Sequence, residues 1–282
     1  MTDSLIQELD RLQNKLEEEA PVRILKIAEA ASLEAQDTSK QIGSGFSDLD
    51  GCMRGGFREG DLTVISGIAG EGKTTLCRMF TLNFAQAGIP SAWFSHEMTV
   101  SELWEEFRLM GANPDLISYV PIELKDDFDW TLKHCDLAIQ QHGAKAIFID
   151  TLGDIVRSVK RQQELSNYAT YLAQLCKDLR KYAIDRRVMV FVVAHAVKNT
   201  KSKSNETENS DIANSAGIAQ AAANVFHVWR DNESDNLSYV KVGKSRRDGT
   251  KKGWKFKFRY SDHKLLQEGR HLDNPNEDVW RS

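Results

Sequence analysis

Residues 67–74 read GIAGEGKT, which has the residue types and spacing of a phosphate-binding loop. Glycines let backbone N–H groups turn toward phosphate oxygens, and the helix that follows directs its positive end at them. In this motif Lys73 reaches the β- and γ-phosphates, and Thr74 offers a hydroxyl to Mg²⁺. The sequence therefore predicts a site for ATP, or another NTP or dNTP, with Mg²⁺; its nucleotide-binding residues are Gly67, Gly70, Gly72, Lys73, Thr74 and Thr75.

Three polar residues follow apolar runs and could turn nucleotide binding into hydrolysis. Asp150 ends the run AIFID, Glu97 ends AWFSHE, and His195 ends VMVFVVAH. Because carboxyl ends of parallel strands share one edge of a sheet, we expect Asp150 to hold Mg²⁺ and Glu97 to activate the attacking water as the general base. His195 is expected to contact the γ-phosphate as a sensor. The alternatives are an ordinary strand-ending Asp, a solvated Glu and a structural His.

Strands and helices alternate along the chain and would position these side chains. Apolar runs predict strands at 61–66, 91–95, 145–150 and 188–194, and helical patterns are present at 74–87, 100–110, 130–141 and 164–182. A small-residue helix (212–223) then precedes strands at 225–229, 238–243 and 254–259. This order predicts an α/β fold, with a mostly parallel central sheet, helices on both faces and an antiparallel C-terminal extension.

Composition places the chain among ordinary globular proteins. It has 282 residues and a formal net charge of −4, so any nucleic-acid contact must come from a local basic patch. Its four cysteines lack metal-like spacing, which indicates reduced thiols in a reducing compartment. We recognise no apolar run long enough to span a membrane and no N-terminal signal peptide, so we expect a cytoplasmic location and no membrane partner.

The two ends differ from the central part. Residues 1–41 are predicted to form a helical arm, in which Leu5, Leu9, Leu12 and Leu16 share one helix face. The arm would pack on its own core or on a neighbouring subunit. Residues 271–282 form an acidic tail that could bind a polymerase or a single-strand-binding protein, or simply be solvated. Residues 198–209 are polar and of low complexity, which predicts a mobile loop.

Several segments together resemble a known family. The stretch GFSDLDGCMRGGFREGDLTVISGIAGEGKTT, followed by FSHEM and FIDTLGDI, resembles the RecA-like P-loop NTPase core of DnaB-type replicative helicases. The segments AHAVKN and SDIANSAGIAQAAANVFHVWRDN resemble the phage primase-helicase branch more closely. The resemblance covers about residues 42–268 and implies a RecA-like ATPase and helicase domain at 42–270, in a bacterial or phage-infected cell.

The resemblance also implies a ring. In this family a Lys-x-Arg pair, here within KSRRDGTKKG, enters the ATP site of the neighbouring subunit. Arg246 would then be a catalytic arginine finger acting in trans and Lys244 would lie beside it, although the adjacent Arg247 is an alternative finger. A homo-oligomer, in the family a hexamer, would surround single-stranded DNA. The DNA-binding residues would be Arg157, Lys160 and Arg161 in one loop and Lys198, Lys201 and Lys203 in another; solvated loop cations are the alternative.

We expect this sequence to hold neither of two modules found in the family: no cysteine spacing fits a zinc-binding primase module, and the roughly 40 residues before the core are too few for the N-terminal helical domain of DnaB-type proteins. The expected function is an ATP-dependent DNA helicase motor moving 5′ to 3′, with a primase among its partners. One alternative is an oligomeric ATPase of the RecA or clock type that does not unwind DNA. Another is a nucleotide-switched replication partner, which would be expected to lack the catalytic Glu or the finger.

Overall fold

The computed structural model describes residues 25–28, 41–155, 168–196, 206–212, 216–231, 236–247, 253–261 and 263–271. The chain divides into two compact units, Met1–Ser39 and Lys40–Ser282, and the fold described below is that of the second unit. The leucine stripe of the expected arm and the acidic tail after His271 lie outside the described residues. Within the described part, no helix combines the length and apolarity needed to cross a bilayer.

A nine-stranded sheet organises this unit, in the order β3-β2-β4-β5-β1-β6-β7-β8-β9. The first six strands in this order are parallel: β3 (Ser118–Tyr119), β2 (Ser91–Ser95), β4 (Ala146–Asp150), β5 (Met189–His195), β1 (Leu62–Gly67) and β6 (Asn224–Arg230). The last three strands are antiparallel: β7 (Leu237–Ser245), β8 (Lys255–Ser261) and β9 (Lys264–His271). The predicted α/β fold with an antiparallel C-terminal extension is confirmed.

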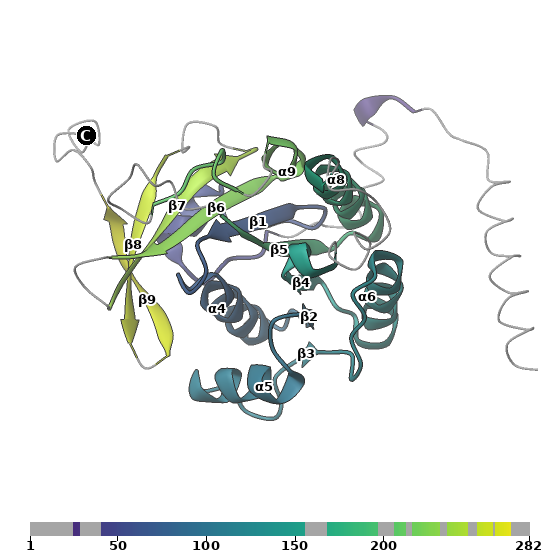
Figure 1. The fold of residues 1–282 in the computed structure, drawn as a ribbon, viewed down its shortest axis with the longest axis horizontal. Helices are drawn as coiled ribbons and strands as arrows, with labels where there is room; N and C mark the ends of the chain where they lie inside the picture. The colour runs from purple at the N-terminus through teal and green to yellow at the C-terminus, as the bar shows by residue number, and fades with distance from the viewer. Residues whose placement is uncertain are drawn as a thin grey trace, which may run out of the picture. The chain divides into compact units, whose positions relative to one another are not determined.

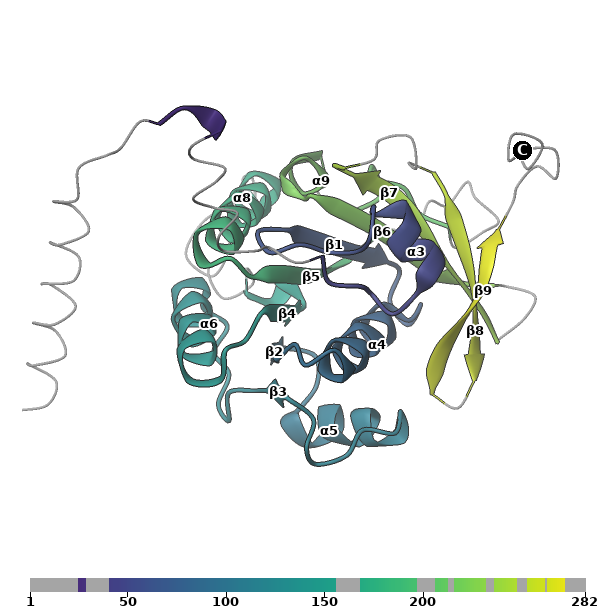
Figure 2. The ribbon, with the colours of Figure 1, turned by 180° about the vertical axis from the view of Figure 1, so that it is seen from behind.

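Helices cover both faces of the sheet, as Figures 1 and 2 show. On one face lie α3 (Ser47–Cys52), α4 (Lys73–Gln86) and α5 (Val100–Leu109). On the other lie α6 (Phe128–His142), α8 (Tyr168–Arg186) and α9 (Ala216–Ala221). The helix expected at 212–223 is therefore shorter than predicted. Its first residue, Ile212, instead forms an isolated β-bridge with Ala196.

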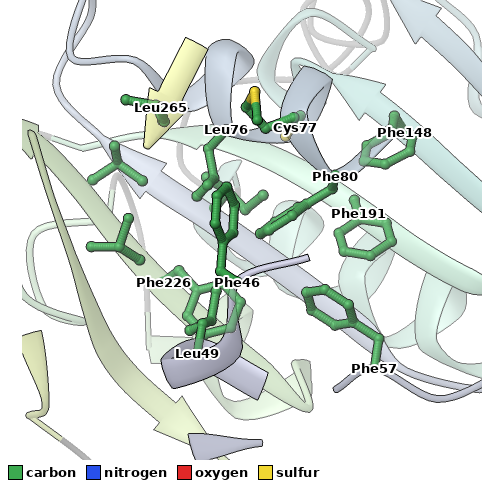
Figure 3. Close-up of a cluster of buried hydrophobic side chains, with 14 of the residues drawn as sticks. Phe46, Leu49, Phe57, Leu76, Cys77, Phe80, Phe148, Phe191, Phe226 and Leu265 are labelled. Carbon is green, nitrogen blue, oxygen red and sulfur yellow. The ribbon is translucent and has the colours of Figure 1, made fainter. Parts of the chain in front are cut away.

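Alternating side chains divide the core into two layers. On β5, Phe191 packs with the α4 face while Val190 and Val192 pack with the α8 face, and all three are buried. Figure 3 shows part of the first layer, where Phe80 of α4 lies among Phe148 of β4, Phe191 of β5 and Phe226 of β6. A strand with apolar residues on both sides must be covered on both faces, which is why helices lie on both faces of the parallel part of the sheet.

Three elements of the described residues were not predicted: α3, β3 and β9. Of the last strand, Lys264–His271, Leu265 is buried and Leu266 is half exposed, so the sequence has only a weak strand pattern there. Its register with β8 is sustained by backbone pairing and by Glu268, which binds Lys257 and Arg259. Those two cations are thus neutralised within the ribbon.

Candidate active site

The phosphate loop connects β1 to α4 in a conformation that only glycines adopt easily. Gly70 and Gly72 have φ of 80° and 95°. A Cβ on Gly67 would lie 2.3 Å from the carbonyl oxygen of Val228 on β6, so a larger residue cannot fit there. The first turn of α4 has no side-chain cap, which leaves its N–H groups available to an anion.

Lys73 opens α4 and lies folded over this loop. Its side chain is buried, and its Nζ donates a hydrogen bond of 2.9 Å to the carbonyl oxygen of Ile68. Burial lowers the pKa of Lys73, while the charges of Glu97, Asp150 and Glu71 act in the opposite direction. The ammonium group therefore sits among carboxylates at the place where phosphates would enter.

Strand pairing aligns the three predicted polar side chains at one edge of the sheet. Ser95 on β2 is level with Asp150 on β4, and Glu97 follows Ser95 by two residues. Gly67 on β1 is level with His195 on β5. The structure thus brings the phosphate loop, Asp150, Glu97 and His195 to the same carboxyl edge.

Asp150 is buried beside the loop. Its Oδ2 accepts a 2.8 Å hydrogen bond from the hydroxyl of Thr74, while its Oδ1 has no hydrogen-bond donor among the described residues. Burial raises the pKa of Asp150 to about 6, the Thr74 hydrogen bond opposes this rise, and the Glu97 charge adds to it. A buried carboxylate oxygen without a donor is costly unless a cation meets it.

These features fit a magnesium-bound nucleoside triphosphate. Mg²⁺ is usually held by one or two protein oxygens together with phosphates and water. The free Oδ1 of Asp150 and the hydroxyl of Thr74 are such oxygens, and they lie beside the uncapped start of α4. The residues present therefore suit this group.

Glu97 and His195 contact each other across the top of β4. Oε1 of Glu97 lies 2.8 Å from Nε2 of His195, and the two side chains are 39% and 36% exposed, so both remain accessible from solvent. The residue before Glu97, His96, is fixed by two contacts. Its backbone N–H donates to the carbonyl oxygen of Asp150, and its ring Nδ1 lies 2.9 Å from Oδ1 of Asp126. A carboxylate supported in this way can accept a proton from water, which is what a general base requires.

The predicted finger residues lie at the opposite edge of the sheet. Strand β7 is antiparallel to β6, so its last residues, Lys244 and Ser245, pair with Val225 and Asn224 at the start of β6. The other end of β6 adjoins the phosphate loop, because the N–H of Arg230 donates to Oε2 of Glu71 at 2.5 Å. Six residue steps at about 3.3 Å each separate the two ends by roughly 20 Å. Arg246, just beyond β7, cannot reach the phosphate loop of its own chain.

The three cations of this segment have different environments. Nζ of Lys244 donates to the carbonyl oxygens of Ala219 and Gln220, and Arg247 forms an ion pair with Asp61. Arg246 is exposed, and its guanidinium has no partner among the residues that the structure describes. Of the two arginines, Arg246 is therefore the one available to another molecule.

Sequence reasoning missed a pair beside the phosphate loop. The guanidinium of Arg230 lies over the ring of Tyr260, 5.4 Å from its centroid, and the backbone of Arg230 binds Glu71 within the loop. The position of Arg230 at the end of an apolar run was a signal for it. Nothing in the sequence indicated that Tyr260, on β8, would lie next to it.

All six predicted DNA contacts, Arg157, Lys160, Arg161, Lys198, Lys201 and Lys203, lie outside the described residues. The described chain before each group ends at Ile155, after β4, and at Ala196, after β5. Both groups thus follow strands whose ends carry Asp150 and His195.

Comparisons with known proteins identify the family and the fold of this chain. A family model described as the KaiC ATPase matches residues 42–211. The replicative DNA helicase DnaB of Mycoplasma pneumoniae is 24% identical over an alignment of 243 residues, and the match covers 73% of this chain and 50% of that protein. The chain therefore spans about half the length of this relative. The DNA repair and recombination protein RadB of Methanococcoides burtonii is 23% identical over an alignment of 174 residues, and the match covers 58% of this chain and 74% of that protein.

A solved DnaB-like replicative helicase, described together with its interactions with primase, has a TM-score of 0.71 and 16% identity. The likeness covers 94% of this chain and 74% of the other. At this identity the comparison demonstrates a shared fold, and the fold shared with such neighbours is the RecA-like one.

Proposed function

Because this chain belongs to the KaiC ATPase family and has a RecA-like P-loop ATPase core, we propose that it is a ring-forming, ATP-driven motor that translocates on single-stranded DNA, as a replicative-type helicase does. One observation carries the proposal: Arg246 is exposed and lies roughly 20 Å from its own phosphate loop at about 3.3 Å per residue. If this arginine serves catalysis, it serves a neighbouring copy, which requires an oligomer.

Each residue of the site has a distinct task in this proposal. Lys73 moves from the carbonyl oxygen of Ile68 to the β- and γ-phosphates, and the N–H groups of the loop bind the remaining oxygens. Glu97 orients a water molecule and accepts its proton. His195 holds the Glu97 carboxylate in the resting site and would sense the γ-phosphate when Glu97 turns toward water. Thr74 and Asp150 would hold Mg²⁺, which supplies charge neutralisation when bound.

Arg246 of a neighbouring copy would complete this site. Fixed positive charge on the transferring phosphoryl group contributes roughly 10³- to 10⁵-fold in rate in related chemistry. The ion pair of Arg247 with Asp61 favours Arg246 over Arg247 for this role, because a finger must have a free guanidinium. Lys244 would stand next to it at the same interface.

The Arg230–Tyr260 pair is proposed to hold the nucleobase. A guanidinium over an aromatic ring forms a flat, cationic surface of the kind that purine rings stack against. Its attachment to the phosphate loop through Glu71 puts it within range of a nucleotide whose phosphates lie at Lys73. This stack would tolerate different bases, so it does not select ATP strongly over other triphosphates.

DNA would be held by the two basic groups that follow β4 and β5. Arg157, Lys160 and Arg161, and Lys198, Lys201 and Lys203, would neutralise phosphates without reading sequence. Their attachment immediately beyond Asp150 and His195 gives hydrolysis a short route to DNA. A hexameric ring moving 5′ to 3′, with a primase, a polymerase or a single-strand-binding protein as further partner, completes the proposal.

The test is ATP hydrolysis with and without single-stranded DNA, for the wild type, for Arg246→Ala and for mixtures of the two. We expect DNA to stimulate turnover, and the variant to inhibit mixtures by more than its share, because one defective finger disables the neighbouring site. Arg108→Ala, which removes an exposed arginine paired with Glu105 on α5, is the matched control. The activity of its mixtures with the wild type should be the weighted average of the two separate activities. Turnover that ignores DNA, together with additive mixing, would refute the proposal.

A second candidate function is an oligomeric ATPase that does not unwind DNA. The KaiC family match and the likeness to RadB favour it, since neither name denotes a helicase. Displacement of a labelled strand from a forked duplex separates the two candidates: the motor displaces it with ATP, whereas the alternative hydrolyses ATP without displacement.

A further inference from the structure

The end of β7 and the residues that follow it are attached to the core at three points around Arg246. Nζ of Lys244 donates to the carbonyl oxygens of Ala219 and Gln220, at 2.7 and 2.9 Å, at the end of α9. The N–H of Arg246 donates to the carbonyl oxygen of Ala223 at 2.9 Å. In Figure 1 the end of β7 lies beside α9, in agreement with these contacts. The backbone of Arg246 is thus fixed while its side chain is exposed.

The third fastening is a forked ion pair. Nη1 and Nη2 of Arg247 donate to Oδ2 and Oδ1 of Asp61, at 2.5 and 2.8 Å. The side chain of Asp61 is 8% exposed and that of Arg247 21%. Oδ2 of Asp61 also accepts a hydrogen bond of 3.1 Å from the N–H of Arg58, which further fixes the carboxylate. Two parallel charge-assisted bonds restrict orientation as well as distance, which a single contact does not.

Asp61 occupies an informative position in the chain. It directly precedes β1, the strand that ends in the phosphate loop at Gly67. One strand therefore carries the nucleotide site of its own chain at one end and the anchor of the Arg246 segment at the other. Asp61 and Arg247 contact each other directly, although they are 186 residues apart in sequence.

We propose that Asp61 is a positioning residue for the arginine finger: through its fork with Arg247 it aims Arg246 at the nucleotide site of the neighbouring copy. The proposal rests on the trans role of Arg246 proposed above. Asp61 itself touches neither nucleotide nor DNA in this scheme. Its loss should impair the site next door and leave the site of its own chain supplied by the other neighbour.

The expected effect is large because catalytic positioning is sensitive to small displacements. A misplacement of about 1 Å can cost around 100-fold in rate. Without the fork, the segment keeps two of its three fastenings, so we expect a loss of roughly 10- to 100-fold in the rate at the neighbouring site.

The experiment uses complementation between two inactive variants of the full chain. Arg246→Ala keeps a complete nucleotide site but offers no finger, and Glu97→Gln offers a finger but has no general base. Equimolar mixtures should recover ATP hydrolysis at interfaces where a Glu97→Gln subunit faces an Arg246→Ala subunit. Asp61→Asn is then added to one partner at a time.

We expect Asp61→Asn to abolish most of the recovered activity when it is in the Glu97→Gln partner, which donates the finger. The same substitution in the Arg246→Ala partner should leave recovery unchanged. Arg247→Lys, which keeps the charge but loses the fork, should reproduce this asymmetry if Asp61→Asn fails to fold. Glu59→Gln is the matched control. Glu59 lies two residues before Asp61, and its substitution removes an ion pair with Lys145 but should leave the recovered activity unchanged in either partner.

The outcomes separate failure of the positioning role of Asp61 from failure of the trans role of Arg246. Equal loss in both partners means that Asp61 is merely structural and overturns the inference, as does the absence of any loss. Failure of the parent mixture to recover activity refutes the trans finger itself, before Asp61 is considered. A loss confined to the finger-donating partner supports the positioning role.

Discussion

Replacing Asp150 by Asn should make the metal-free protein more stable while it abolishes hydrolysis. Asn preserves the shape of the side chain and can still accept the hydrogen bond from Thr74. It removes a buried carboxylate whose Oδ1 has no hydrogen-bond donor among the described residues. The residue proposed to hold Mg²⁺ is thus also a source of instability until a cation binds.

The magnitude follows from the pKa of Asp150, which burial raises from 3.8 to about 6. A raised pKa means that the folded protein holds the proton more tightly than the unfolded chain, so ionisation costs the folded state. The cost is absent below pH 4 and complete above pH 6. Two pKa units correspond to about 3 kcal/mol, or a Tm difference of about 6–12 °C for a domain of this size.

The assay is unfolding by denaturant of the wild type and of Asp150→Asn, in a chelating buffer between pH 5 and pH 8. The free energy of unfolding of the variant should exceed that of the wild type by up to about 3 kcal/mol at pH 8, and the difference should shrink as pH falls toward 5. Adding Mg²⁺ and a non-hydrolysable ATP analogue should reverse the order. Asp185→Asn, at an exposed position of α8, is the control and should show no such trend.

A difference that is independent of pH, or a variant less stable than the wild type at pH 8, would refute this reasoning. Either result would mean that Asp150 is already compensated in the resting site. The lack of a hydrogen-bond donor to Oδ1 of Asp150 among the described residues would then not indicate a cation site.

The other predictions concern the phosphate loop, the general base and the base stack. Gly67→Ala should abolish nucleotide binding or folding, because its Cβ would lie 2.3 Å from the carbonyl oxygen of Val228; nucleotide titration and circular dichroism check this. Glu97→Gln should lower the ATPase rate by roughly 10²- to 10⁴-fold while a fluorescent nucleotide still binds, and Glu102→Gln, exposed on α5, should be neutral. Tyr260→Ala should raise KM for ATP about tenfold through lost stacking, whereas Tyr260→Phe should not; equal values for the two variants would exclude a base stack.

Local patterns determined much of the fold in advance. The strand at 91–95 was predicted with the bounds that the structure has, and most other central elements agree within one or two residues. These strands are continuously apolar because both of their faces are covered, and such runs are visible without tertiary information. The phosphate loop was equally visible, since its glycines and Lys73 are contiguous in the sequence.

The weaker patterns failed for physical reasons. Strand β9 was not predicted, because Leu265 is buried while Leu266 is half exposed and the strand pattern is weak. Helix α9 proved shorter than the small-residue run suggested. Residues 241–259 are rich in lysine and arginine, but three of these cations are paired within the chain: Lys241 and Lys255 bind Glu206, and Arg259 binds Glu268. Ion pairs between distant segments leave no signature in local composition.

By itself the sequence determined which residue types could bind a triphosphate and activate water, because each of these groups closes or follows a recognisable run. The tertiary structure decided which groups meet: Thr74 with Asp150 across 76 residues, Glu97 with His195 across 98, and Asp61 with Arg247 across 186. It also decided that Arg246 lies far from the phosphate loop of its own chain, since β7 pairs antiparallel with β6. Strand order and direction arise from burial and hydrogen bonding summed over the whole sheet, and no local stretch of the chain contains that sum.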